Sequence, residues 1–497
     1  MSLPSVVVAP FSQESFFEAL ECPCAVSEVA ANRRVSYLLD YLREIGAKTI
    51  VVEEEYVDGD YLDDYASFYV KCFEDYPKRC KRLHFFAVET SSAQFLQIVT
   101  NRAEGTITRA FADAYLGFVV ARPLPKAVIG RTILKTYPSA SGRRNYTCTK
   151  MYSANLFGLE LQIESLAYQE QDRALAACAT VALWACFQKD RDLFQSLSPT
   201  PATITRSANT VLEDARPFPS QGLKIEQICN AIAAVGLEPE VIEVKPGIPL
   251  VSLLYGYLQL GAPVLLVVRI PDVGLHALTL TGFSLNPGAV LLLEGADPGK
   301  TPPLVGLRID EFYAHDDQVG PFSRLKVIPP TAVGQTVKFA GGWPNELTPV
   351  AIIIPLYTKI RLGYLEVLKW LWRLRGLISA ISPGGSVEWD LFLMTSNRFK
   401  SLARAGEAQV PSTELEAILM KGHPRFVWRG VFKRDSNLVV ELLVDTTAMT
   451  DSFPIYRLWW HDDAVKASVQ QLLKAKAVET ALNELLTVRF ADFLRAA

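Results

Sequence analysis

The sequence predicts an α+β protein with three domains. Its 497 residues exceed one domain, since domains commonly hold about 100–200 residues. With 49% hydrophobic and 21% charged residues, the composition is that of a folded globular protein and excludes a largely disordered or collagen-like chain. Turn-rich stretches at residues 138–146 and 329–344 interrupt the hydrophobic periodicity. They predict domains at residues 1–155, 156–330 and 331–497.

The first domain is expected to be of α/β type, with no role indicated by its sequence. Short apolar runs at residues 6–9 and 49–52 and the segment 115–123 predict buried strands. Apolar residues at helical spacing predict a helix over residues 28–45.

The first domain contains one acidic and one basic run of residues. Each could be a binding site, but we expect neither to be one. Seven carboxylates lie between residues 53 and 64, and we expect a solvated face there rather than a site for a metal or a basic partner. The basic run at residues 78–82 is short and lies close to this acidic run, so nucleic-acid binding is not expected.

The third domain is expected to be α+β as well. Its predicted elements are a strand at 351–355, a helix at 362–378, a strand at 387–394, a hairpin of strands at 426–432 and 438–444 around a KRDSN turn, and a closing helix from 463 to about 495. The first and third domains lack catalytic motifs, so we expect them to bind the substrate or a protein partner.

Charge and cysteine usage indicate a cytoplasmic protein. The net charge is −3, which gives no global attraction to nucleic acid or anionic lipid. The N-terminus lacks the pattern of a signal peptide, and the apolar runs are far shorter than the roughly 20 residues of a membrane-spanning helix. Eight cysteines without CxxC pairs indicate reduced thiols rather than a disulfide framework. We therefore expect no membrane association.

The second domain carries the residues that predict chemistry. Only five histidines occur in the chain, and His276 lies in an alternating segment that predicts a strand. A second buried strand, residues 261–270, precedes it and predicts a hairpin. Asp297 follows a further predicted strand at 290–294, so an acid and a base are expected to meet across neighbouring strands.

Cys178 is the candidate nucleophile. The chain changes from polar residues to continuous helix formers just before Cys178, and the start of a helix stabilises a thiolate. Gln171 lies seven positions earlier and carries an amide that can complete an oxyanion hole with the Cys178 backbone N–H. Cys186, two turns further along the helix, is expected in the core.

At these residues the sequence resembles a known family. The ordered features are a glutamine before a cysteine that begins a helix, Gly-Leu-x5-Cys-Asn-Ala-Ile-x3-Gly-Leu at 222–237, Leu-x2-Gly-Ala-Pro-Val at 258–264, Leu-His at 275–276 and Asp-Pro at 297–298. They resemble the papain-like cysteine peptidases that process double-glycine leader peptides of bacteriocins. The resemblance covers about residues 160–325, one third of the chain.

The resemblance implies a cysteine peptidase with a Cys-His-Asp triad. Cys178 would be the nucleophile, His276 the general base and acid, and Asp297 the orienting carboxylate. Gln171 would be the oxyanion donor. The implied fold packs a helical half with the nucleophile helix on an antiparallel sheet, and the implied substrate is a peptide or protein cut after a pair of small residues.

Two departures from the family pattern keep alternatives open. Ala179 stands where the family has glycine, and Asp172 stands where its glutamine usually lies. Gln169 is therefore an alternative oxyanion donor. The alternative functions are a catalytically inactive scaffold or interaction protein, and a thiol acyltransferase that delivers the acyl group to an amine.

A cluster of possible metal ligands lies further along the second domain. His315, Asp316 and Asp317 offer metal ligands or a spare acid–base pair, but the sequence Asp-Asp-Gln-x-Gly-Pro favours a turn. The chain has neither a GxxxxGK[ST] run nor a strand-linked GxGxxG, so no cofactor is expected. We also expect no metal.

Overall fold

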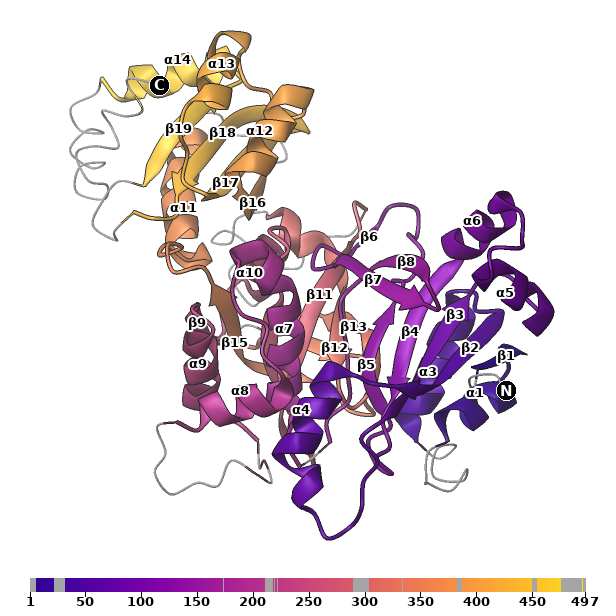
Figure 1. Cartoon of the computed structure of the whole chain (residues 1–497). Helices are drawn as coiled ribbons and strands as arrows, with labels where there is room; N and C mark the ends of the chain where they lie inside the picture. The colour runs from indigo at the N-terminus through magenta and orange to yellow at the C-terminus, as the bar shows by residue number, and fades with distance from the viewer. Residues whose placement is uncertain are drawn as a thin grey trace.

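The fold is a mixed α+β arrangement with several antiparallel sheets, seen in a computed structural model (Figure 1). The structure describes residues 6–21, 32–172, 174–210, 218, 220, 222–288, 304–332, 334–381, 387–448, 454–474 and 494. A five-stranded sheet near the N-terminus, a larger central sheet and a four-stranded sheet near the C-terminus follow one another along the chain. Figure 1 shows the last of these at one end of the molecule.

The N-terminal sheet has the order β1-β2-β3-β4-β5, and all its neighbours are antiparallel. Its strands are β1 (Val6–Pro10), β2 (Thr49–Tyr56), β3 (Cys80–Phe86), β4 (Tyr115–Ala121) and β5 (Ile129–Leu134). The strands predicted at residues 6–9 and 49–52 are confirmed, and the strand predicted at 115–123 is present as β4, which ends at Ala121. The helices are α1 (Gln13–Leu20), α3 (Arg33–Glu44), α4 (Gly59–Ser67), α5 (Ser92–Val99) and α6 (Gly105–Asp113), with a 3₁₀ turn η1 at Tyr69–Lys71. Helix α3 lies within the range predicted for a helix.

The prediction that the acidic run faces solvent is wrong in part. Asp58 and Asp64 are buried. Arg131 forms an ion pair with Asp58, with a nitrogen–oxygen distance of 3.3 Å, and another with Asp60 at 2.6 Å. Burial without a cationic partner would be costly for a charged carboxylate, so the pairing with Arg131 explains how the sequence tolerates Asp58 inside. Asp64 forms no such ion pair among the described residues, and burial raises its pKa well above the ordinary value, which favours the neutral acid.

The basic run pairs with the same acidic segment across two neighbouring strands. Lys81 lies 3.3 Å from Glu54, and Arg82 lies 2.5 Å from Glu53. Strands β2 and β3 are antiparallel and place Glu53 opposite Arg82. The two charged runs therefore neutralise each other at this position in the sheet.

The central sheet carries the candidate site. Its order is β14-β13-β12-β11-β10-β15-β9, and β6 pairs with β11. The strands are β6 (Arg144–Asn145), β9 (Glu238–Glu243), β10 (Val264–Ile270), β11 (Gly274–Leu285), β12 (Ile309–Asp316), β13 (Gly320–Ile328), β14 (Lys338–Ala340) and β15 (Thr348–Leu356). The predicted hairpin around His276 is confirmed as β10 and β11, with Val268 opposite His276. The sheet also recruits strands from outside residues 156–330.

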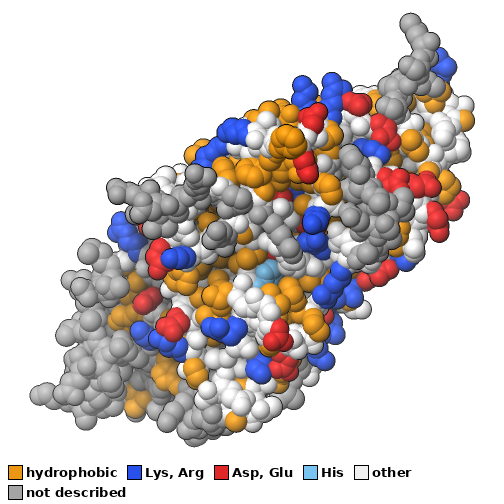
Figure 2. Space-filling view, turned by 90° about the horizontal axis from the view of Figure 1, so that it is seen from below, with side chains coloured by type: hydrophobic (Ala, Val, Ile, Leu, Met, Phe, Trp, Pro, Cys, Tyr) orange, Lys and Arg blue, Asp and Glu red, His pale blue; other side chains and the backbone are white. Residues whose placement is uncertain are grey.

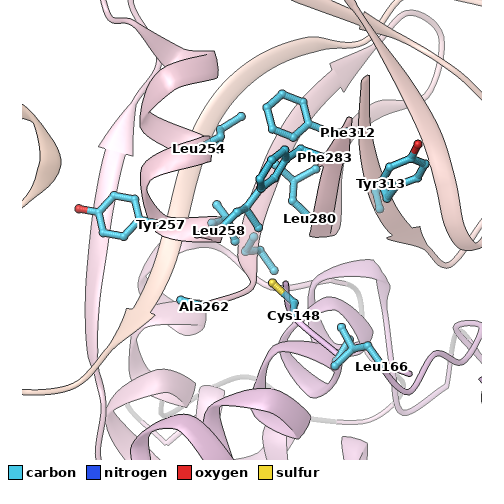
Figure 3. Packing of buried hydrophobic residues seen from close by; sticks show 14 of the residues in the cluster. Cys148, Leu166, Leu254, Tyr257, Leu258, Ala262, Leu280, Phe283, Phe312 and Tyr313 are labelled. Atoms are coloured by element: carbon cyan, nitrogen blue, oxygen red, sulfur yellow. The ribbon is translucent and has the colours of Figure 1, made fainter. Parts of the chain in front are cut away.

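Helices and a small hairpin accompany the central sheet. They are α7 (Cys178–Phe194), α8 (Pro201–Ala208), α9 (Ile225–Ala234), α10 (Leu250–Leu258), a 3₁₀ turn η2 (Val305–Arg308) and the hairpin β7 (Lys150–Leu156) and β8 (Leu159–Ser165). Helix α7 packs against β11, and the Thr279 hydroxyl donates a hydrogen bond to the Ala182 carbonyl at 2.8 Å. Figure 3 shows Leu254 and Leu258 of α10 beside Phe283 and Leu280 of β11. This packing fixes the helices on the sheet.

The C-terminal sheet has the order β16-β17-β18-β19. Its elements are α11 (Tyr364–Ile381), β16 (Val387–Thr395), α12 (Ser396–Ala405), α13 (Ser412–Met420), β17 (Phe426–Arg434), β18 (Asn437–Asp445), β19 (Ile455–Trp460) and α14 (Asp463–Leu472). The predicted hairpin is confirmed, and Asp435 and Ser436 at its turn both have positive φ, which suits the twist of a two-residue hairpin. Most of the predicted closing helix beyond residue 474 lies outside the described residues.

One face of the molecule carries charges of both signs. Figure 2 shows Lys and Arg side chains interspersed with Asp and Glu among hydrophobic side chains, with a histidine visible near the middle. Opposite charges at such short spacing largely cancel at a distance, so the visible part of this face has no field of a single sign.

Within the described residues, no helix combines the length and hydropathy required to cross a membrane.

Asp190 on α7 is buried. Neither oxygen of its carboxylate accepts a hydrogen bond from any described residue. Burial raises the pKa of Asp190 well above its ordinary value, and the charge of Lys189 opposes that rise only weakly. The folded protein therefore favours the neutral carboxylic acid, whereas the unfolded chain ionises at a pKa of about 3.9.

Asp190→Asn is expected to raise the unfolding temperature at pH 7. Between the unfolded pKa and the higher folded pKa, the wild type loses about 1.4 kcal/mol of stability per pH unit, because only the unfolded state releases the proton. Asparagine has no proton to release, so the advantage of the variant should grow from pH 5 to pH 7. Thermal unfolding of both proteins at several pH values measures this, and a pH-independent difference would contradict it.

Candidate active site

Cys178 is the first residue of helix α7. Its backbone N–H lies among those that have no partner within the helix, so the side chain stands beside a free backbone donor at the positive end of the helix dipole. The side chain is partly exposed, whereas Cys186 further along the same helix is fully buried, as predicted.

The turn before Cys178 is shaped by Asp172. One oxygen of its carboxylate accepts hydrogen bonds from the backbone N–H groups of Ala174, Leu175 and Ala176 at 3.0, 2.9 and 2.8 Å. The other oxygen accepts a hydrogen bond from the Tyr69 hydroxyl at 2.8 Å. Asp172 therefore organises the approach of the chain to the helix, and it is an acceptor rather than a donor.

The segment just before this turn is attached to the N-terminal sheet. Tyr168 and Thr132 exchange two backbone hydrogen bonds of 2.7 and 2.9 Å. The Glu170 carboxylate accepts a hydrogen bond from the Ile129 N–H at 2.6 Å and lies 2.7 Å from the Arg34 guanidinium. These contacts fix the position of Gln169, which lies between Tyr168 and Glu170.

His276 lies near the start of β11 and is buried. Its Nε2 lies 2.9 Å from Oδ1 of Asp316 at the end of β12. The Cys178 side chain also contributes to raising the pKa of His276. The imidazole therefore interacts with both the thiol and the carboxylate, and its Nε2 is the nitrogen that Asp316 occupies.

Opposing effects act on the pKa of His276. Burial lowers it, whereas the charge and hydrogen bond of Asp316 and the interaction with Cys178 raise it. The net result is a pKa well above the ordinary value for histidine, which favours the imidazolium form.

Asp316 is held as a charged acceptor. It accepts hydrogen bonds from the Gln318 N–H at 2.9 Å and from the Trp343 indole at 2.8 Å. Burial alone raises the pKa of Asp316, but the charge of His276 and the hydrogen bonds from His276 and Trp343 outweigh burial, and the pKa lies below its ordinary value. The Trp343 ring also packs edge-on against His276, with ring centres 5.3 Å apart, so it covers the acid–base pair.

Asp317 lies beside this pair in a different protonation state. Burial and the neighbouring charge of Asp316 raise its pKa to about 7, although His276 opposes the rise. Its Oδ2 accepts a hydrogen bond from the Gln318 side chain at 3.0 Å, whereas Oδ1 accepts none from the described residues. Two adjacent carboxylates thus differ in charge because only Asp316 receives strong donors.

A small cavity adjoins the Cys178 side chain. Its volume is about 10 Å³, which is room for roughly one water molecule. Its polar lining includes Gln169, Tyr168 and Asp317, and each has a buried polar atom without a hydrogen-bond partner among the described residues. The Gln169 amide nitrogen is therefore a donor available next to the thiol.

The structure brings together some of the predicted site residues. The Cys178 side chain contributes to raising the pKa of His276. Asp297 lies outside the described residues, and the carboxylate that His276 binds is Asp316. Gln169 rather than Gln171 lines the cavity, because the pairing of Tyr168 with the N-terminal sheet directs its neighbour there.

His315 is a structural residue. Its Nε2 donates to the Leu166 carbonyl at 3.1 Å, and its Nδ1 accepts from the Phe322 N–H at 3.1 Å. Burial lowers the pKa of His315 to about 3, so the ring is neutral at physiological pH. The predicted turn after His315 is present between β12 and β13, and the same turn supplies Asp316 to the site.

Comparison with known proteins gives no relative. No protein-family model, no curated protein and no solved structure matches this chain.

Proposed function

We propose that this protein is a thiol-dependent hydrolase that cleaves an amide bond of a peptide or protein through Cys178, His276 and Asp316. The observation that carries the proposal is the arrangement of a thiol at a helix start, an imidazole that interacts with it, and a buried carboxylate on Nε2 of the ring. This is the relation of nucleophile, base and orienting group that activates a thiol.

The reaction follows from the roles of the two ring nitrogens. In the resting site His276 Nδ1 holds the proton that Cys178 has given up, in keeping with the imidazolium that the raised pKa of His276 favours, and the thiolate attacks the carbonyl carbon. The imidazolium then gives this proton to the leaving amine as the carbon–nitrogen bond breaks. Water, deprotonated by the same nitrogen, attacks the thioester, and the acid product and free thiol are released. Asp316 keeps the proton on Nε2 throughout, so Nδ1 is left to exchange protons.

Gln169 is assigned as the oxyanion donor. The amide nitrogen of Gln169 has no hydrogen-bond partner among the described residues, and Gln169 lines the cavity beside Cys178. The backbone N–H at the first position of α7 is the second donor in this proposal. Two such donors stabilise the charge that develops on the carbonyl oxygen.

A catalytically inactive scaffold is the second candidate. The observation that favours it is the small size of the cavity at Cys178, which has space for one water molecule but not for a substrate side chain. A thiol acyltransferase uses the same residues and differs only in releasing the acyl group to an amine. Thiol reactivity separates the scaffold from both enzymes, and product analysis with added amine separates the two enzymes.

Iodoacetamide at neutral pH should alkylate Cys178 faster than the other thiols. Since the helix start and His276 favour the thiolate, we expect a rate at least about 10-fold above that of Cys229, which is also partly exposed but has its pKa raised by burial. Mass spectrometry of the modified peptides gives both rates in one sample.

Two variants control the alkylation experiment. Cys178→Ala should remove the fast site, and Cys229→Ala should leave it intact. Equal and slow reaction of both thiols in the wild type would refute the enzyme proposal and support the scaffold.

Asp316→Asn should lower the pKa of His276. The charge of Asp316 is the main contribution that raises this pKa, so an uncharged asparagine should return it towards the range of ordinary histidines or below. At pH 7 the ring should therefore be charged in the wild type and mostly neutral in the variant. NMR titration resolves this because the chain has only five histidines, and His276→Gln assigns the signal. An unchanged titration would contradict the assigned pair.

Gln169→Ala should weaken binding of an aldehyde that mimics the tetrahedral intermediate. Loss of one oxyanion donor costs about 10²–10³-fold in comparable sites, so inhibition by N-acetyl-Gly-Gly-aldehyde should weaken by a similar factor. The measurement is competition of the aldehyde against iodoacetamide at Cys178. Gln171→Ala is the matched control and should bind the aldehyde as the wild type does. If Gln171→Ala weakens binding of the aldehyde and Gln169→Ala does not, the oxyanion donor is Gln171.

A further inference from the structure

His276, Asp316 and Asp317 form a compact set of metal ligands. One ligand atom from each lies within 4.8 Å of the others, and all three residues are buried. Nε2 of His276 lies 2.9 Å from Oδ1 of Asp316 and 3.8 Å from Oδ1 of Asp317. Oδ1 of Asp317 accepts no hydrogen bond from the described residues, and the side chain is only 3% exposed. A buried carboxylate oxygen without a hydrogen-bond donor calls for a further partner, for which a cation or a water molecule is suited.

We propose that these three residues bind a zinc ion, which holds the site in an inactive state. Zinc accepts nitrogen and carboxylate oxygen ligands at about 2.0–2.2 Å in tetrahedral geometry, so its ligand atoms lie roughly 3.3 Å apart. The distances of 2.9 and 3.8 Å lie on either side of that separation. Small shifts of the two carboxylates would complete three corners, and a water molecule would supply the fourth.

The binding step exchanges protons for the metal. Zinc takes the lone pair of Nε2 after that nitrogen loses its proton, and a protonated Asp317 also releases its proton to solvent. Neutral imidazole then keeps its remaining proton on Nδ1, the nitrogen that the proposed function assigns to Cys178. Because Nδ1 no longer has a free lone pair, it does not accept the thiol proton.

The thiol lies outside this set of ligands. Cys178 is not among the three clustered ligands, and the proposed function assigns it to Nδ1, so a zinc ion at Nε2 would leave the sulfur unbound. The proposed site therefore differs from one in which the Cys178 thiolate and the His276 imidazole bind zinc together. Binding of zinc requires no reactive cysteine, whereas the inhibitory effect rests on the proposed function.

Zinc binding is tested with the full chain in competition with a chromogenic chelator. The wild type and Cys178→Ala should bind one zinc ion with similar affinity. Asp317→Asn should bind at least about 10-fold more weakly, since it removes a charged ligand at nearly constant shape. Asp190→Asn is the matched control, because it makes the same change at a buried aspartate outside the proposed site, on α7. It should bind zinc as the wild type does.

Cobalt identifies the ligands by spectroscopy. Co²⁺ in the wild type should show ligand-field bands of a tetrahedral site without the strong near-ultraviolet band of thiolate ligation. That thiolate band, together with loss of binding in Cys178→Ala, would place the metal on the sulfur and overturn the proposal. Absence of zinc binding to the wild type would overturn it as well.

The effect on the thiol is measured separately. Zinc should slow alkylation of Cys178 at least about 10-fold, and a chelator should restore the rate. In Asp317→Asn the same zinc concentration should slow it much less. If the unfolding temperature of Asp317→Asn differs from that of the wild type, His276→Gln is used instead. It tests zinc binding by removing the nitrogen ligand. If Cys178→Ala binds zinc while wild-type Cys178 is unreactive, the enzyme proposal fails and the metal site stands.

Discussion

The buried pair of His276 and Asp316 is the interaction on which the site depends. A histidine that is removed from water loses its affinity for protons unless a negative charge compensates it. Asp316 supplies that charge, and it remains ionised in the interior because Gln318, Trp343 and His276 all donate hydrogen bonds to it. The strand pairing of β11 and β12 brings the two residues within reach. The protonation state of the site is therefore a consequence of sheet register and of the turn after β12.

Local patterns in the sequence identified much of the secondary structure and two of the site residues. The hairpin of β10 and β11 and the start of α7 follow from alternation and from the change to helix formers, so Cys178 and His276 were predictable. The carboxylate partner of His276 was not. The sequence indicates that Asp316 lies in a turn, but only the register in which β12 pairs with β11 shows that this turn returns to His276.

The oxyanion donor was ambiguous for a similar reason. Gln169 and Gln171 lie two positions apart, and spacing to Cys178 alone gave no means of choosing between them. The choice depends on contacts from outside the segment, namely the backbone pairing of Tyr168 with Thr132 and the turn that Asp172 organises. The acidic run was misassigned because a charge pattern does not reveal where the compensating cation lies, and Arg131 is far from it in sequence.

The N-terminal sheet helps to position the residue proposed as the nucleophile. The segment that leads to Cys178 receives backbone hydrogen bonds from β5, an ion pair from Arg34 on α3 and a hydrogen bond from Tyr69. The Arg122 side chain also donates a hydrogen bond to the Glu170 carbonyl at 3.0 Å. An isolated central sheet would lose all these partners, and the buried polar groups of residues 168–172 would be left without them. The order of the proposed site therefore depends on a region that carries no catalytic motif. The segments predicted as first and second domains share the task of holding residues 168–172 in place.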